Sequence, residues 1–387
     1  MKRFVVVLVL AMIVAAFGPG DAQPVPYEIT AITSLTGAGA FIGKAQAESF
    51  RVIEGYVNKN GGVRGHPVKF LVLDDQTNPV VAVQLFNQAI AKKAAVVLGP
   101  ALTATCAAVT PLVKSGPVDY CLSPGIEPVR GSYVFSASDS LMDQAIVLLR
   151  YFRLRGWTRV GLITSTDATG QAMTADVAAA AALPENASMQ IVANERFNAA
   201  DVSVAAQMSR IKSSNPHALI AWSTGTQFGT LLRGINDIGL DVPVGAGTGN
   251  MNNDQLSQYA GFMPKALFFP GLQSLVSGGP VPKAVRDAQN AYYGVFKAAG
   301  LTPGFLNNLA WDPTMLVLAA LRANGLDASA EQIRSHIDNL QGWAGVNGLY
   351  DFKQRPGRGI GPAASVIDQW DVTKGTFTVV SKPGGFL

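Results

Sequence analysis

Residues 58–79 read NKNGGVRGHPVKFLVLDDQTNP and contain a turn, a strand and a helix start in one short stretch. A Gly-Gly turn and a basic loop precede an apolar run at 68–73, which ends in two carboxylates, Asp74 and Asp75. The Asn-Pro pair that closes the stretch is a helix-start signal. This order of turn, buried strand, acidic strand end and helix is typical of one βαβ unit in a parallel sheet.

The same alternation continues on both sides of this stretch. Before residue 133, strands are expected at 27–33, 68–74, 94–99 and 117–123, with helices at 43–58, 79–93 and 103–114. After residue 140 the alternation restarts, with strands at 159–165, 189–197, 218–223, 242–247 and 266–271. Its helices are expected at 141–152, 170–182, 202–213, 227–238 and 253–259. The sequence therefore predicts an α/β fold with two doubly wound parallel-sheet lobes.

The last third of the chain departs from this rhythm. Three helical segments, at 281–299, 309–323 and 329–340, precede a final pair of strands. These helices have no obvious place in the second lobe, so we expect them to return to the first. A chain that crosses between lobes more than once makes a hinge. The 387 residues, 48% of them hydrophobic, are enough for two such cores.

The first 22 residues resemble a secretory signal peptide. Lys2 and Arg3 form a basic start, and the apolar run at 4–17 is too short for a comfortable membrane span. Gly20 and Ala22 are small residues at the spacing of a cleavage site, so the mature chain is expected to begin at Gln23. A membrane anchor is the alternative, which the length of the run disfavours.

The charge balance argues against a nucleic-acid partner. The formal charge is +4, and removal of Lys2, Arg3 and Asp21 with the signal peptide leaves +3. No run of basic residues accompanies this mild excess, so nothing in the chain is typical of a nucleic-acid footprint.

Cys106 and Cys121 are the only cysteines of the chain. A secretory signal implies an oxidising compartment, where a disulfide can persist. Cys106 is expected on a helix and Cys121 on the strand that follows it, an arrangement that can bring the two Cα atoms within disulfide range. The sequence predicts a bridge, and two buried free thiols are the alternative.

Residue patterns for catalysis, metals and cofactors are missing from the sequence. The three histidines are far apart and lack metal-ligand spacing, and no nucleophile elbow or Walker phosphate loop occurs. GAGTGN at 245–250 lacks the last glycine of a dinucleotide fingerprint and is better interpreted as a tight turn. Asp74 and Asp75 are neighbours on a strand and point to opposite faces, which disfavours a shared acid–base site. We therefore expect no catalytic residues, no metal site and no cofactor.

Glycine and hydroxyl residues gather where the predicted strands end. They occur at 99–105, 123–128, 164–170, 223–227 and 247–253. Ligands of open parallel sheets bind beyond the carboxyl ends of the strands, where small residues expose backbone amides and hydroxyls add neutral donors. Helix capping is the alternative for any single loop. Five such loops in two lobes predict a small-molecule site in a cleft between the lobes.

Several of these segments together resemble one family. The opening stretch is similar to the Asn-x-x-Gly-Gly-x-x-Gly, strand, Asp-Asp segment of the type I solute-binding proteins of ABC importers, the group that includes the leucine/isoleucine/valine-binding proteins. SLTGAGAFIG (34–43) resembles their first ligand loop, and GPALTATCAAVTPLVKSGPVDYCLSPG (99–125) resembles their Gly-Pro, hydroxyl, helix and strand run. LAWDPTMLVLAAL (309–321) resembles their late aromatic-Asp helix.

The resemblance implies two lobes joined by three crossovers that close on a ligand by hinge motion. The crossovers are expected near Ser136–Ser140, Gly271–Ser274 and Val346–Asp351. The N-terminal lobe would then comprise residues 23–138 plus 272–347, and the C-terminal lobe residues 139–271 plus 348–387. It also implies a monomer in the periplasm of a Gram-negative bacterium, with an ABC permease as partner and no enzymatic activity.

The resemblance assigns the ligand's carboxylate to the first lobe. Thr103 matches the hydroxyl residue that binds it through side chain and backbone N–H, with Ala104 and Thr105 beside it. Gly125 matches a residue whose carbonyl faces the ligand. Glu127 stands where the family usually has serine or threonine, so the site would gain a carboxylate there.

The resemblance also places residues around the rest of the ligand. Ile42 stands where many members have an aromatic wall, and Thr169 and Thr224 replace two common tyrosines of the second lobe. Thr248 stands where amino-acid binders often have the acid that pairs with the ligand's ammonium group. Trp311 is expected either as an aromatic wall or in core packing.

These substitutions predict an uncharged second lobe with extra room. A buried ammonium without an acid is costly, so the first choice of ligand is an aromatic carboxylic or aromatic keto acid. An amino acid or amide, with Glu127 as the ammonium partner, is the alternative. A ligand-sensing receptor module is an alternative of another class, because fold alone does not fix function.

Overall fold

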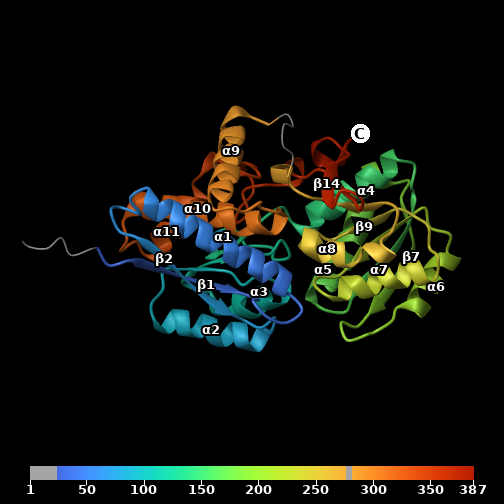
Figure 1. Ribbon diagram of the computed structural model, residues 1–387, viewed down its shortest axis with the longest axis horizontal. Helices are drawn as coiled ribbons and strands as arrows, with labels where there is room; N and C mark the ends of the chain where they lie inside the picture. The colour runs from blue at the N-terminus through green and yellow to red at the C-terminus, as the bar shows by residue number, and fades with distance from the viewer. Residues whose placement is uncertain (1–23, 276–280) are drawn as a thin grey trace, which may run out of the picture.

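The computed structural model describes residues 24–275 and 281–387 and contains two α/β lobes side by side (Figure 1). The signal peptide predicted at residues 1–22 lies outside the described residues. Among the helices that are described, none combines the length and the apolar character needed to cross a membrane.

The first lobe has a five-stranded sheet in which every neighbouring pair is parallel, in the order β2-β1-β3-β4-β5. Its strands are β1 (Tyr27–Thr33), β2 (Val68–Asp74), β3 (Val96–Leu98), β4 (Val118–Cys121) and β5 (Val134–Ser136). Helices α1 (Ala40–Lys59), α2 (Pro79–Ala91) and α3 (Thr103–Val109) connect them. The stretch at 58–79 forms β2 as predicted. It then starts α2, where Asn78 Oδ1 accepts a hydrogen bond from the Val80 amide at 2.9 Å.

The second lobe has a seven-stranded sheet in the order β14-β13-β10-β9-β8-β6-β7. The parallel strands are β6 (Arg159–Ser165), β7 (Gln190–Phe197), β8 (Ala218–Trp222), β9 (Val244–Ala246) and β10 (Leu267–Phe269). Two antiparallel strands, β13 (Asp368–Asp371) and β14 (Thr376–Val379), extend the sheet from β10. Its helices are α4 (Leu141–Leu154), α5 (Ala168–Ala181), α6 (Ala205–Ser213), α7 (Gln227–Asp237) and α8 (Asn253–Gln258). The predicted fold class is confirmed.

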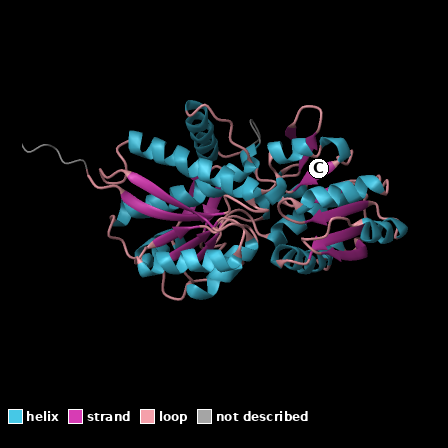
Figure 2. Cartoon of the chain, turned by 60° about the horizontal axis from the view of Figure 1, so that its bottom comes forward, coloured by secondary structure: helices cyan, strands magenta, loops and turns pink. Residues whose placement is uncertain are grey.

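The helices that follow the second lobe pack on the first. They are α9 (Lys283–Ala298), α10 (Phe305–Asn324) and α11 (Ala330–Asp338). Helix α10 lies along α1, where Ser49 Oγ donates to the Asn307 carbonyl at 2.9 Å and Asn307 Nδ2 donates to the Ala45 carbonyl at 2.8 Å. Helices consequently cover both faces of the first sheet (Figure 2).

A β-hairpin stands where the sequence suggested a crossover. Strands β11 (Gln341–Gly345) and β12 (Gly348–Asp351) pair in antiparallel fashion across a tight turn at Val346 and Asn347. The buried carboxylate of Asp312 accepts hydrogen bonds from both turn amides, at 3.0 and 3.2 Å, and fixes the hairpin on α10. Local sequence does not reveal this capping carboxylate, because it comes from a distant helix.

Three chain segments meet between the lobes. Ser365 Oγ donates to Asp139 at 2.5 Å, and Ser365 also forms an antiparallel bridge with Leu272. Further along, the Ser136 amide donates to the Gly357 carbonyl at 2.9 Å, so residue 357 still contacts the first sheet. The predicted boundary between residues 347 and 348 stays a prediction, and these contacts favour a later one, near residue 360.

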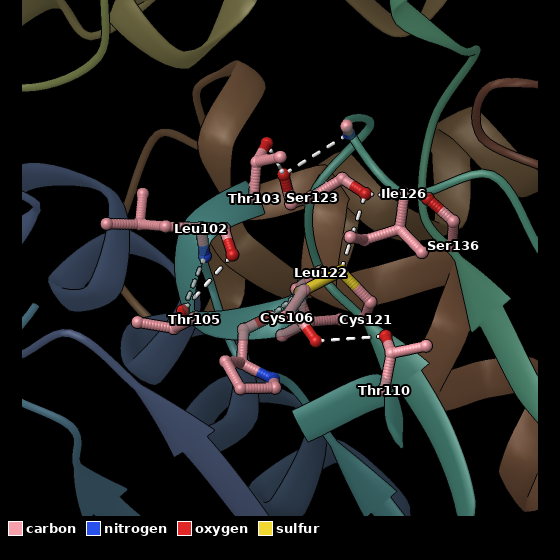
Figure 3. Close-up of a disulfide and its surroundings, with 12 residues drawn as sticks. Leu102, Thr103, Thr105, Cys106, Thr110, Cys121, Leu122, Ser123, Ile126 and Ser136 are labelled. Atoms are coloured by element: carbon pink, nitrogen blue, oxygen red, sulfur yellow. Dashed lines mark hydrogen bonds between the residues drawn. A yellow bond between two sulfur atoms is a disulfide. The ribbon is translucent and has the colours of Figure 1, made fainter. Parts of the chain in front are cut away.

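Cys106 of α3 and Cys121 of β4 form a disulfide in the first lobe, as the sequence predicts (Figure 3). Their Cα atoms are 5.9 Å apart, and both residues are fully buried. The bond fixes the start of α3 against the sheet, beside the loop that follows β4.

Candidate ligand-binding site

A narrow cavity lies between the two lobes. The first lobe contributes Ile42 of α1, residues 101–103 after β3, residues 122–124 after β4, and Leu309 of α10. The second lobe contributes Leu141 of α4, Thr169 of α5, Trp222 and Thr224 at the end of β8, and residues 247–249 after β9. These segments follow the carboxyl ends of parallel strands, which is where open α/β sheets bind ligands.

Two hydroxyl groups meet on the first-lobe side of the cavity. Thr103 Oγ1 and Ser123 Oγ are 3.0 Å apart and both residues are buried (Figure 3). One proton is shared between them, so the other hydroxyl proton remains available to a ligand oxygen. Gly125 leaves space for this pair, because a Cβ at residue 125 would lie 2.0 Å from Thr103 Oγ1.

Backbone amides add further donors beside these hydroxyls. The amides of Thr103, Ala104 and Thr105 have no acceptor among the described residues, whereas the Cys106 amide already bonds to the Leu102 carbonyl at 2.8 Å. Thr105 Oγ1 turns back to the Leu102 carbonyl at 3.1 Å and closes the first turn of α3. Of these three residues only Thr103 lines the cavity, so the first-lobe side offers the Thr103 amide and the two hydroxyls, donors without a positive charge that suit an oxyanion.

The second-lobe side is lined by hydroxyls and by one large aromatic ring. Trp222 is only 2% exposed, and its indole lies against Gly247, where a Cβ would approach Cε2 to 2.9 Å. Within the described chain, the Trp222 indole N–H and the hydroxyls of Thr169 and Thr224 have no hydrogen-bond partner. They are available to a bound molecule.

None of the described side chains that line the cavity is charged. The apolar part of its wall is mainly aliphatic and includes Ile42, Leu102, Leu122, Leu141 and Leu309. The site therefore combines donors at one end with an uncharged, largely apolar body.

Five of the residues predicted for the site line the cavity, namely Ile42, Thr103, Thr169, Thr224 and Thr248. Ala104, Thr105, Gly125, Glu127 and Trp311 are not among the lining residues. Trp311 is buried, with its ring centroid 5.0 Å from that of Tyr292, so it belongs to the packing between α9 and α10. Of the two interpretations that the sequence left open for Trp311, the structure shows core packing.

Glu127 lies outside the cavity in an ion pair. Its Oε1 is 3.2 Å from Arg358 Nη2, and its side chain is 72% exposed. Arg358 is buried and also donates to Ser136 Oγ at 3.0 Å and to the Ser138 carbonyl at 3.2 Å. Across the lobe boundary, partial burial and then the charge of Glu127 raise the pKa of Asp176 to about 6.

Sequence reasoning missed several residues of the site. Ser123, Leu141 and Trp222 line the cavity, and Gln144 contacts Thr248 from behind. Ser123 ends the predicted strand at 117–123 and begins the glycine- and hydroxyl-rich loop at 123–128, so the sequence contains the signal that places it in the site. Trp222 ends an apolar strand and is indistinguishable from a core residue until the loops around it are placed.

Two parallel-sheet lobes that meet at a shared cavity define a two-lobed binding protein. A family model described as "Periplasmic binding protein" matches residues 26–371, and the chain belongs to this family. The family resemblance is confirmed, and the chain is a binding protein rather than an enzyme. A comparison with curated proteins gives no match.

Solved structures share this fold at low sequence identity. An extracellular ligand-binding receptor from Rhodopseudomonas palustris HaA2 has a TM-score of 0.81 at 20% identity, over 92% of this chain and 99% of that one. The branched-chain amino acid binding protein LivJ from Streptococcus pneumoniae, in complex with isoleucine, has a TM-score of 0.75 at 19% identity, over 92% and 99%. The leucine-binding protein LivK from Thermotoga maritima has a TM-score of 0.75 at 18% identity, over 92% and 96%.

Proposed function

We propose that this protein is the periplasmic solute-binding component of an ABC importer and that it binds a small organic acid between its lobes. The observation that carries this proposal is the division of the cavity into a donor-rich end and an uncharged body. The hydroxyls of Thr103 and Ser123 and the Thr103 amide would bind the carboxylate. The protein would act as a monomer that presents its closed form to a permease in the inner membrane.

An aromatic carboxylic or keto acid is the first choice of ligand. The indole of Trp222 and the apolar side chains of Leu102, Leu141 and Leu309 suit a flat apolar body. The two lobes lie close together around the cavity, since a Cβ at Gly249 would be 3.6 Å from Ile42 Cδ1. This narrow space favours a compact ligand with one ring over a larger one.

An amino acid or amide remains the alternative ligand. One similar structure, LivJ, is described in complex with isoleucine. A buried ammonium group needs an acid or several acceptors, and no described lining residue is acidic. Glu127, the partner that the sequence suggested, is exposed and paired with Arg358, which disfavours this alternative.

A calorimetric panel tests the proposed ligand class. Leucine and phenylalanine would be titrated into purified ligand-free protein beside benzoate-type, phenylpyruvate-type and cinnamate-type acids. We expect tight binding of at least one aromatic acid, which should also stabilise the fold by about 2.7 kcal/mol at a hundredfold excess over Kd. Tight binding of leucine or phenylalanine, with none by their deaminated analogues, would contradict the proposed class.

A ligand-sensing module is the alternative of another class. Permease and ATPase genes next to this one would support transport. A receptor or regulator gene in that place, together with a complex between its product and the ligand-bound protein, would support sensing instead.

A further inference from the structure

A chain of buried hydrogen bonds runs from the cavity to the segments between the lobes. Thr248, which lines the cavity, donates through Oγ1 to Gln144 Oε1 at 3.3 Å. Gln144 Nε2 donates to Asp139 Oδ1 at 3.4 Å. Asp139 also accepts from Ser138 Oγ at 2.7 Å and from Ser365 Oγ at 2.5 Å. All five residues are buried, so no solvent competes for these bonds.

The chemistry of Asp139 decides which group donates and which accepts in each of these hydrogen bonds. An ionised carboxylate only accepts hydrogen bonds, so the Gln144 amide must turn its NH₂ group toward it. Burial raises the pKa of Asp139 to about 6, with the charge of Asp143 adding to the rise and the charge of Arg358 opposing it. Asp139 is therefore mainly ionised at pH 7.5. Gln144 Oε1 is left facing Thr248.

Because Gln144 Oε1 can only accept, Thr248 cannot donate its hydroxyl proton to a ligand. A threonine hydroxyl has one proton and two lone pairs, and here the proton is used in the bond to Gln144. The Thr248 oxygen consequently presents only lone pairs to the cavity. On the opposite side, the Thr103–Ser123 hydroxyl pair and the Thr103 amide present donors. Thr248 is therefore an acceptor-only position of the second-lobe wall, whereas the Trp222 N–H and the hydroxyls of Thr169 and Thr224 near it can still donate.

We propose that Thr248 accepts a hydrogen bond from the ligand and that the site selects an organic acid with a hydroxyl or amide N–H over its keto or ether analogue. This inference rests on the proposed function and narrows its ligand class. Gln144 is a positioning residue in this account, because it acts only by holding the Thr248 proton. A site that must hydrogen-bond a ligand donor rejects an analogue lacking that donor, since its own buried acceptor stays unpaired.

Matched ligand pairs test the preference at pH 7.5 by calorimetry. The pairs are 3-phenyllactate against 3-phenylpyruvate, and 4-hydroxybenzoate against 4-methoxybenzoate, so that the donor is tried on the side chain and on the ring. We expect the hydroxyl member of at least one pair to bind roughly tenfold more tightly, the effect of one hydrogen bond in a dry site. Equal or tighter binding of the keto and methoxy members in both pairs would overturn the proposal.

Variants of Thr248 and Gln144 distinguish a role in ligand recognition from a role in supporting the structure of the site. Thr248→Val keeps the shape of the side chain and should reduce the preference for the hydroxyl member to near unity. Thr248→Ser should restore the preference. Gln144→Met should also reduce it, because the Thr248 proton is then free to turn toward the ligand. A purely structural role would lower the affinity of both members alike, so an unchanged affinity ratio in Thr248→Val overturns the inference.

The same variants distinguish failure of this inference from failure of the proposed function. If phenylalanine binds and the aromatic acids do not, the proposed ligand class is wrong. An ammonium group is also a donor, so Thr248→Val should then weaken phenylalanine binding by roughly tenfold. Unchanged phenylalanine affinity in that variant would overturn the role of Thr248 as well.

Discussion

The hydroxyl of Thr103 occupies its place because residue 125 has no side chain. A Cβ at residue 125 would lie 2.0 Å from Thr103 Oγ1 and 2.6 Å from its Cγ2, so any larger residue would displace the threonine. Gly125 was predicted to face the ligand through its carbonyl, and that role stays a prediction. The structure adds a second reason for glycine at this position, which is the room it leaves for the Thr103–Ser123 pair.

Thr103→Ala should weaken ligand binding by roughly 1 kcal/mol or more and leave the fold intact, because one donor to the carboxylate is lost. Calorimetry with a ligand from the aromatic acid panel measures the loss, and circular dichroism monitors the fold. Thr103→Ser is the matched control, since it keeps the hydroxyl and should bind nearly as well as the wild type. Equal affinity of the alanine variant and the wild type would contradict the placement of the carboxylate.

Asp119 is a buried acid that should make the stability of the fold depend on pH. It lies on β4 with its side chain fully buried, and neither carboxylate oxygen has a partner among the described residues. Burial raises the pKa of Asp119 well above its usual value. The folded state therefore holds this proton more tightly than the unfolded state. Its contribution to stability is fully present below pH 3.8 and is lost as the pH rises through the folded pKa.

Asp119→Asn should flatten this pH dependence. The stability of the variant relative to the wild type should rise by about 1 kcal/mol or more from pH 5 to pH 8, because over this range folding makes the wild type keep a proton on Asp119 or bury its charge, and the variant does neither. Urea unfolding at both pH values gives the two differences in unfolding free energy. Asp139 and Asp312, whose pKa values are each raised to about 6, titrate in both proteins and cancel in the comparison. A constant difference from pH 5 to pH 8 would show that Asp119 does not titrate as described.

Elements of the fold differ in how far the sequence predicts them. The alternation of strands and helices was predictable because each parallel strand is an apolar run between turn residues, as in residues 68–74. Several boundaries shift. The helix expected at 43–58 begins at Ala40, after Gly39, whose amide donates to Thr77 Oγ1 at 3.0 Å from a distant part of the chain. Hairpin β11–β12 depends on Asp312, and the orientation of Thr248 depends on Gln144, over 100 residues away in sequence. No local pattern contains such contacts.

The disulfide holds α3 against β4, and reduction should show how much it contributes to the free energy of unfolding. Cys106 and Cys121 are 15 residues apart, and a bridge of that loop length stabilises by about 3 kcal/mol through the entropy of the unfolded chain. Urea unfolding with and without reductant should show a loss of this order. Alkylation followed by intact-mass measurement should find no free thiol before reduction and two afterwards. Two alkylated thiols without reductant would rule out the bridge in solution.

At the scale of the whole molecule, the two lobes touch directly. Gly225 follows β8 in the second lobe, and a Cβ there would lie 2.4 Å from the Ala38 carbonyl of the first lobe. Nearby in the second lobe, a Cβ at Gly249 would lie 3.6 Å from Ile42 Cδ1 of the first lobe. These contacts and the small cavity describe a closed arrangement. A fold with three connecting segments is expected to open by a hinge motion and to close on its ligand.

Small-angle scattering tests this motion, and residue 225 provides a way to block it. The wild type should have a smaller radius of gyration with saturating ligand than without it. Gly225→Ala should keep the larger radius and bind more weakly, because the new methyl group meets Ala38 before the lobes can close. Gly225 has φ +86°, so part of any stability loss comes from backbone strain.

Gly156→Ala is the matched control for backbone strain, since Gly156 has φ +80° but no heavy atom within 4 Å of its Cβ position. The control should lose similar stability yet close normally on the ligand. If both variants close as the wild type does, the contact between Gly225 and Ala38 does not limit closure. An unchanged scattering profile of the wild type at saturating ligand would contradict the hinge motion itself.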